Sequence, residues 1–173
     1  MKYLIVISFV VTILFSSCAE SERTKQYNTI IEMENRLTND TTMVLNRNVA
    51  LDLSSKYDQF ATDFPKDSLA AKYLFKAGDM TMNLNLGSKA VGYFNRILNN
   101  YPEFEKTPET VFLKAFVYEN IIGDLNKAKE VYTLFINSYP DHGLYKDAEV
   151  SIKNMGKPLE QIIKEFEEQN KEE

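Results

Sequence analysis

The sequence predicts an all-α fold, built as a solenoid of antiparallel helix pairs. Apolar residues recur at steps of three and four positions through most of the 173 residues, which is the period of an α-helix. No stretch shows a sustained alternation of apolar and polar residues, so strands are not expected. An aromatic residue followed by proline recurs at Phe64-Pro65, Tyr101-Pro102 and Tyr139-Pro140, at intervals of 37 and 38 residues. Intervals of about 20 to 50 residues are typical of repeat architectures.

Residues 1–17 are expected to be a signal peptide and not part of the fold. Lys2 supplies a basic start, and the apolar run from Leu4 to Phe15 is too short for a bilayer, which needs about 20 residues. The run ends in small residues and Cys18, the only cysteine of the chain. This pattern resembles a bacterial lipoprotein signal, in which the cysteine is lipidated and becomes the first residue of the mature chain. The alternatives are an ordinary secretory signal and an uncleaved anchor, with a cysteine at this place by chance.

The rest of the chain divides into a short tether and one helical repeat domain. Residues 18–26 are polar and charged after the cysteine, as expected of a tether, and the length of residues 27–173 fits a single domain. We expect eight helices in four antiparallel pairs, at 24–38 with 46–63, 68–84 with 88–100, 108–122 with 125–138, and 143–155 with 158–169.

The signals for the individual pairs differ in strength. In the first pair, the opening helix carries few apolar residues, and the link from Thr38 to Met43 is polar and longer than the other links. In the second and third pairs, Gly87 and Gly123 fall where a tight turn between two helices is needed.

The last helix is expected to cap the solenoid. It carries a narrow apolar stripe with glutamates on the opposite side, and the stripe consists of Leu159, Ile162, Ile163 and Phe166. An end helix of a solenoid must be apolar on its inner face and polar on its outer face, and this pattern satisfies both requirements.

The second and third pairs read as two copies of one unit. Residues 73–102 align with residues 111–140 at an offset of 38, and seven of these 30 positions are identical. The identities include Lys76 with Lys114, Ala77 with Ala115, Ala90 with Ala128, and both Tyr-Pro pairs. The aromatic Phe94 of the second pair aligns with Tyr132 of the third, and a fainter copy of the unit precedes them with Tyr57 at the same place.

At these residues the chain resembles a tetratricopeptide-repeat (TPR) protein. The family has small residues where its paired helices cross, an aromatic residue further along the second helix, and a closing proline; the matching residues here are Ala115, Tyr118, Ala128, Tyr132, Phe135 and Pro140. The chain departs from the family in having no tryptophan and in a period longer than the usual length of about 34 residues. Together with the lipoprotein-like leader, the pattern resembles the periplasmic group that includes BamD and CpoB (YbgF), whose individual roles do not transfer to this shorter chain.

The resemblance implies a TPR-like solenoid that binds a protein or peptide on its concave face. By match to the groove positions of the family, the residues expected to line this face are Asp79, Met82, Phe116, Glu119 and Asn120. The implied function is that of a lipid-anchored scaffold for protein–protein interactions in the bacterial cell envelope, in outer-membrane assembly or envelope maintenance. The alternatives are an accessory lipoprotein that binds a small ligand or glycan for a transport system, and a structural spacer. Because Ala19 and not aspartate follows the cysteine, the sorting rule that comes with the resemblance favours the outer membrane.

Composition argues against several other classes of function. The net charge is −5 and the pI is near 5.1, so nucleic acid is not an expected partner. With one cysteine and one histidine, an intrachain disulfide and a Cys/His zinc site are excluded, and we expect no metal and no cofactor. His142 lies in a loop sequence with no recognisable nucleophile or ligand set beside it, so we expect a chain that is not an enzyme.

The position of Cys18 predicts where the mature chain begins. Wild-type protein should start at Cys18 and partition into detergent, because a lipid-modified cysteine is retained by the membrane. The Cys18→Ala variant should accumulate as the uncleaved precursor, which intact-mass measurement of membrane fractions will detect. An unmodified mature protein that starts at another residue contradicts the lipoprotein assignment.

Overall fold

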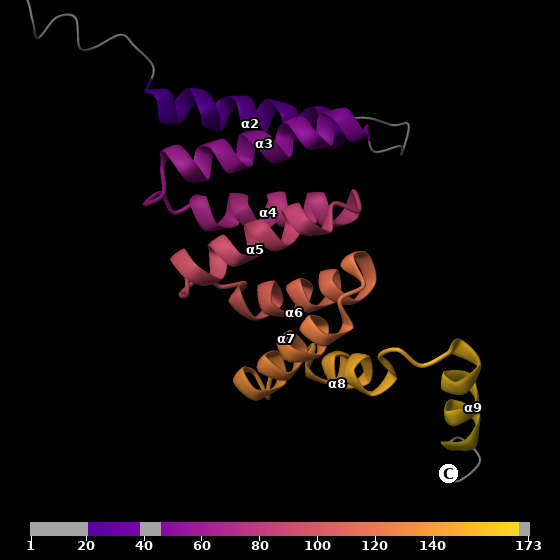
Figure 1. Ribbon diagram of the computed structural model, residues 1–173. Coiled ribbons are helices and arrows are strands. Elements are labelled where there is room, and N and C mark those ends of the chain that lie inside the picture. Colours follow the sequence, from indigo (N-terminus) through magenta and orange to yellow (C-terminus); the bar gives the residue numbers. More distant parts are fainter. Residues whose placement is uncertain (1–20, 39–45, 170–173) are drawn as a thin grey trace, which may run out of the picture.

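The computed structural model describes residues 21–38 and 46–169 and is helical throughout this part, with no strand (Figure 1). Its elements are α2 (Glu22–Thr38), α3 (Arg47–Asp63), α4 (Ala70–Asn83), α5 (Gly87–Asn100), α6 (Thr107–Val117), a π-helical turn η1 (Tyr118–Ile122), α7 (Leu125–Ser138), α8 (Tyr145–Asn154) and α9 (Leu159–Gln169). The all-α prediction is confirmed, and every predicted helix boundary lies within two residues of the observed one. The leader and Cys18 lie outside the described residues.

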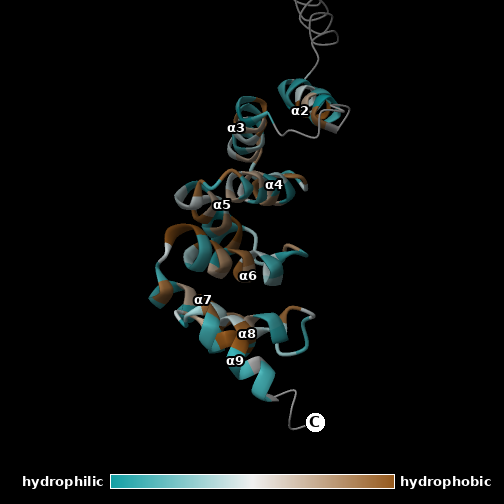
Figure 2. Cartoon of the chain, turned by 90° about the vertical axis from the view of Figure 1, so that its right-hand side faces the viewer, coloured by the Kyte–Doolittle hydropathy of each residue, from teal (hydrophilic) through white to brown (hydrophobic). Residues whose placement is uncertain are grey.

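The helices from α2 to α8 form one stack in which each helix packs against the next along the chain (Figure 1). Seen from the side, α2, α4 and α6 lie on one side of this stack and α3, α5 and α7 on the other (Figure 2). We call the side formed by α2, α4, α6 and α8 the even layer. α2 begins at Glu22, so residues 22–26 of the expected tether are already helical. Within residues 21–38 and 46–169, no helix is long and apolar enough to cross a membrane.

Small residues let the two helices of a pair approach closely. Gly78 of α4 lies directly against the ring of Phe94 of α5, so that a methyl group at Gly78 would meet the ring at 2.4 Å. Ala90 and Ala128, the predicted crossing residues of α5 and α7, are both fully buried. Three adjoining core clusters run through the stack, and each is built around aromatic residues of an odd-numbered helix.

The aromatic–proline pairs end the odd-numbered helices in the same way each time. The carbonyl oxygens of Phe64, Tyr101 and Tyr139 accept a hydrogen bond from the backbone N–H three residues later, at 3.0, 3.0 and 3.2 Å. The proline that follows each aromatic residue has no N–H and cannot continue the helix. The spacing of these pairs therefore predicted the spacing of the helix pairs correctly.

Each repeat unit is one helix pair: α2 with α3, α4 with α5, and α6 with α7. The third unit is one residue longer than the second, and the extra residue lies in η1, between α6 and α7. At the start of the even-numbered helices, the bond from Tyr73 N to Leu69 O has its counterpart 37 residues later, from Thr110 N to Lys106 O. At the end of the same helices, Leu86 N donates to Thr81 O, whereas Asp124 N reaches one residue further back, to Tyr118 O. A π-turn is the form in which a helix absorbs a single inserted residue.

This insertion corrects the repeat alignment for the first helix of each unit. The offset of 38 holds for α5 and α7, but α4 and α6 align at 37, so Gly78 and not Ala77 is the counterpart of Ala115. Lys76 and Lys114 are likewise not equivalent. After the insertion, Asn85 (φ 61°) and Gly123 (φ 79°) are equivalent residues with left-handed backbone at the turns. Gly87, expected in that turn, is instead the first residue of α5.

α9 does not cap the stack as its amphipathic pattern suggested. Among the described elements, none packs along α9, which stands to one side of α8 (Figure 1). The reason lies in α8: at the positions where α6 buries Val111 and Ala115 against α7, α8 has the exposed residues Glu149 and Lys153, beside the exposed Val150. A charged face of this kind does not bury an apolar helix, so α8 itself is the polar end of the solenoid.

The contact between Gly78 and Phe94 predicts opposite effects for two glycine substitutions in neighbouring helices. Gly78→Ala should lower the free energy of unfolding by about 1–3 kcal/mol, because the added methyl group overlaps a buried ring. Gly92→Ala, on the exposed side of α5 with no atom within 4 Å, should raise it by about 0.5–1 kcal/mol through helix propensity. Urea unfolding measures both. Equal effects of the two substitutions would contradict the assigned packing.

Candidate functional site

The five residues expected to line the partner groove lie in the even layer, on α4, on α6 and on the turn η1 that continues α6. With the offset of 37, Asp79 on α4 is the counterpart of Phe116 on α6, and Met82 is the counterpart of Glu119 in η1. Phe116 is 38% exposed and Asn120 is also exposed. Asp79, Met82 and Glu119 are partly buried.

These five residues differ in what they can offer a partner. Met82 packs against the buried cluster between α4 and α5, so it belongs to the edge of the core. Glu119 Oε2 accepts a hydrogen bond from the Tyr132 hydroxyl at 3.0 Å, which fixes the carboxylate in place. The Asn120 amide donates to the carbonyl oxygen of Phe116 at 3.1 Å. Phe116 is thus the aromatic side chain of this set that is open to contact.

Asp79 lies in a partly desolvated position beside a cation. Burial raises the pKa of its carboxyl group, while a hydrogen bond with Asn83 and the charge of Lys106 act in the opposite direction. The ammonium group of Lys106 lies 5.2 Å from the ring centroid of Phe75 on α4, within the range of a cation–π contact. Sequence reasoning missed Lys106 and Phe75, because this contact depends on how the α5–α6 connection folds back over α4.

A cluster of hydrogen-bonded polar side chains in the even layer joins α2, α3 and α4. Glu34 Oε1 on α2 accepts hydrogen bonds from the Tyr57 hydroxyl at 2.6 Å and from the Lys76 ammonium at 2.5 Å. Burial acts to raise the pKa of the Glu34 carboxyl, but the hydrogen bonds from Lys76 and Tyr57 outweigh it, and the pKa is lowered. Burial and the same carboxylate raise the pKa of Tyr57 above its ordinary value. No motif in the sequence indicated this group.

The same arrangement recurs in the third unit. Tyr57, Phe94 and Tyr132 occupy equivalent places in α3, α5 and α7. The two tyrosine side chains extend from the odd-numbered helices to the even layer, and each donates a hydrogen bond from its hydroxyl group to a carboxylate there. Tyr57 donates to Glu34, and Tyr132 donates to Glu119. Phe94 has no hydroxyl group and fills the space over Gly78 instead.

His142 has a structural role in the connection between α7 and α8. Its Nδ1 accepts a hydrogen bond from the backbone N–H of Leu144 at 3.2 Å, and its ring packs edge-on against Phe135 at 5.5 Å. Its Nε2 lies 4.0 Å from Glu109 Oε1. These contacts hold the connection in place, as the loop interpretation predicts. Across the described residues, no group of three or more His, Cys, Asp or Glu side chains is arranged to hold a metal ion.

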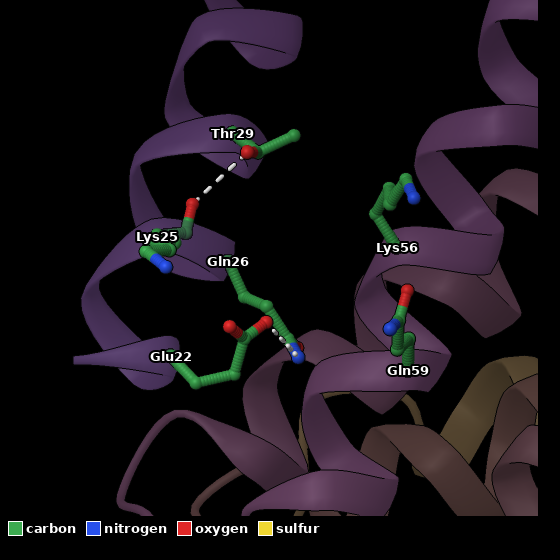
Figure 3. A pocket seen from close by; sticks show the side chains of 6 residues that line it. All are labelled: Glu22, Lys25, Gln26, Thr29, Lys56 and Gln59. Atoms are coloured by element: carbon green, nitrogen blue, oxygen red, sulfur yellow. Dashed lines mark hydrogen bonds between the residues drawn. The ribbon is translucent and has the colours of Figure 1, made fainter. Parts of the chain in front are cut away.

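The described part of the chain has several open hollows on its surface, and three of them, of about 410 to 550 Å³, are larger than the one between α2 and α3. Between the start of α2 and the middle of α3 lies a hollow of about 170 Å³, lined by Glu22, Lys25, Gln26, Thr29, Lys56 and Gln59 (Figure 3). The amide of Gln26 donates to Asp63 at 2.8 Å and faces Glu22 in this view (Figure 3). Small-molecule sites are typically about 300–1,000 Å³ and mostly apolar, so this hollow does not favour a small-ligand function, whereas the hollow of about 550 Å³ beside Tyr101, Pro102 and Phe104 lies within that range of volume.

The lowered pKa of the Glu34 carboxyl predicts that the fold loses stability in acid. Because the pKa of its carboxyl is below the ordinary 4.5 in the folded chain, the ionised group stabilises the fold above that value. This contribution is lost as the pH falls through the lowered pKa. Tyr57→Phe should raise the pKa of Glu34 and reduce the difference in unfolding free energy between about pH 7 and about pH 3. Tyr139→Phe, at the end of α7, is the control that should leave this difference unchanged.

The comparison with known families identifies one of the three units. Residues 109–142, which include most of α6, all of η1 and α7, and the closing Pro140, match the family model for the tetratricopeptide repeat. A comparison with curated proteins gave no significant match. The all-helical stack agrees with a solenoid of such repeats, and tetratricopeptide repeats generally mediate protein–protein interactions. The chain therefore contains a tetratricopeptide repeat, formed by its third helix pair.

Proposed function

We propose that this chain is a lipid-anchored scaffold of the cell envelope that binds a protein or peptide on its even layer. The observation that carries the proposal is Phe116, an aromatic side chain that is 38% exposed on the repeat identified by the family match. Exposed aromatic residues on rigid helices are frequent energetic centres of interfaces.

A further feature of the even layer supports this surface as the binding site. Glu34 and Glu119 are held by tyrosine hydroxyl groups, so a partner meets carboxylates whose positions are already fixed. Preorganised groups of this kind lower the entropy cost of binding.

The anchor proposal rests on the leader sequence that ends at Cys18. Only three residues separate Cys18 from Glu22, where α2 begins. Four extended steps of the chain reach at most about 14 Å, so a lipid on Cys18 would hold the α2–α3 end of the solenoid close to the membrane. The even layer would then face sideways, along the membrane. We propose the outer membrane as the location because of Ala19.

We propose no catalytic step for this chain. An all-helical repeat fold is typically a scaffold, and the contacts of His142 are those of a residue that stabilises a loop. On this account, His142→Ala leaves the partner interaction intact.

The proposed site is tested by a paired substitution with a matched control. A photoreactive amino acid at Phe116 identifies the partner in intact cells, and its affinity is then measured with purified proteins. Phe116→Ala with Asn120→Ala should weaken binding at least tenfold, which corresponds to about 1.4 kcal/mol. Leu134→Ala removes a side chain that is 55% exposed on α7, outside the even layer, and should not change the affinity.

Circular dichroism separates a binding defect from unfolding. If the paired variant stays helical and binds its partner as tightly as the wild type, the even-layer proposal is wrong. If only the Leu134 variant loses binding, the partner contacts the other face.

A further inference from the structure

The helix α9 carries an apolar stripe that no other part of the described chain covers. We call Leu159, Ile162 and Ile163 the α9 stripe. Leu159 is 67% exposed and Ile163, one turn later on the same face, is 49% exposed. At 100° per residue, Glu160 and Glu167 border the stripe on one side, and Glu168 lies on the opposite face of the helix.

The body of the same chain does not take up this stripe. The outer face of α8 presents Glu149 and Lys153 where an apolar helix would have to pack. The linker also directs α9 away from the stack: Gly156 has left-handed backbone (φ 74°), and the Lys157 ammonium binds Glu165 Oε2 at 2.7 Å, across the first two turns of α9. α9 is thus held as a projecting arm (Figure 1).

A second apolar surface lies at the turn between η1 and α7. We call Ile122 and Leu125 the edge patch, and they are 41% and 40% exposed. Lys129, one helical turn after Leu125 on the same face of α7, is exposed beside the patch. The linker to α9 begins here, because a methyl group on Gly156 would lie 3.4 Å from Leu125 Cδ1.

We propose that two copies of this chain exchange their α9 helices, each placing its α9 stripe on the edge patch of the other. The charges at the borders are complementary, because Glu160 and Glu167 border the stripe and Lys129 borders the patch, while Asp124, between Ile122 and Leu125, is paired with the Lys127 ammonium at 3.2 Å. Both halves of the contact belong to one chain, so a two-fold axis forms the contact twice. A stable interface buries about 1,200 Å² or more in total, so each of the two contacts has to supply about 600 Å².

A second copy fits this surface better than an unrelated partner for a reason that rests on the proposed anchor. Two chains anchored by Cys18 in one membrane stand side by side in the same direction, so their C-terminal ends lie at the same height. Anchoring also raises the local concentration of one copy around another, which favours weak self-association. The exchange itself does not require the lipid, so it is measurable with the full chain in detergent solution.

Disulfide trapping tests the exchange directly. Ile163→Cys is placed in one copy and Leu125→Cys in a differently tagged copy, and the two full chains are co-expressed and oxidised. A disulfide between the two tags is expected, and none with Glu168→Cys in place of Ile163→Cys. The wild-type pair controls for Cys18. If no mixed disulfide forms, or if Leu125→Cys and Ile163→Cys in one chain form only an intrachain bond, the proposal is wrong.

A charge exchange gives an independent test with surface substitutions that should not disturb folding. Lys129→Glu and Glu167→Lys alone should each weaken the dimer at least threefold in sedimentation velocity, and a mixture of the two single variants should recover both contacts, one with the native charge pair and one with the charges exchanged. Ile163→Asp should give a monomer of unchanged helicity, while Glu168→Gln should stay dimeric. A wild-type chain that is monomeric at every concentration overturns the exchange but leaves the proposed partner site on Phe116 untouched, because that site is measured by its own substitution.

Discussion

The close approach of an even-numbered helix to the aromatic residues of the next helix determines how this chain is built. At Gly78 the backbone of α4 lies against the ring of Phe94, and there is no room for a methyl group. Ala115 is the corresponding small residue of α6 and is fully buried in the cluster that contains Tyr132. Because these residues must face inward, the opposite faces of α4 and α6 are turned outward, and Phe116 lies on the outward face.

The same aromatic position connects the core to the proposed binding surface. A tyrosine there extends its hydroxyl group to a carboxylate of the even layer, Glu34 in the first unit and Glu119 in the third. The phenylalanine of the second unit makes no such bond. In the second unit both partners differ, because the ring is Phe94 and the counterpart of Glu119 is Met82, so the surface chemistry varies along the solenoid although the packing repeats.

The fold was predictable from the sequence because its signals are local. Helical period and the aromatic–proline pairs gave every helix to within two residues. The inserted residue was not predictable in the same way: the identities of Lys76 with Lys114 and of Ala77 with Ala115 support an offset that the backbone hydrogen bonds contradict. In the choice of the offset, these chance identities counted for more than the structural match of Gly78 with Ala115. Glycine and alanine serve the same packing role, but they are not identical and so give no signal in such an alignment.

The candidate site was predictable only in part. Family positions selected Phe116 and Asn120, which are exposed, but also Met82, which packs at the edge of the core. The contact between Lys106 and Phe75 depends on a folded connection, and no spacing in the sequence encodes it. The stripe of α9 predicted an amphipathic helix correctly, but the residues that decide its place, Glu149 and Lys153, lie on α8.

The central claim is that partners bind the even layer of a tetratricopeptide-type solenoid. Hydrogen–deuterium exchange of the chain with and without the partner captured in cells tests it most directly. A segment bound on the even layer should protect the backbone amides beneath it from exchange. The amides of the odd-numbered helices are protected by the packing of the stack, with or without a partner. The account predicts slower exchange in α4, α6 and α8 on binding, with α3, α5 and α7 unchanged. Protection confined to α3, α5 and α7 would contradict it.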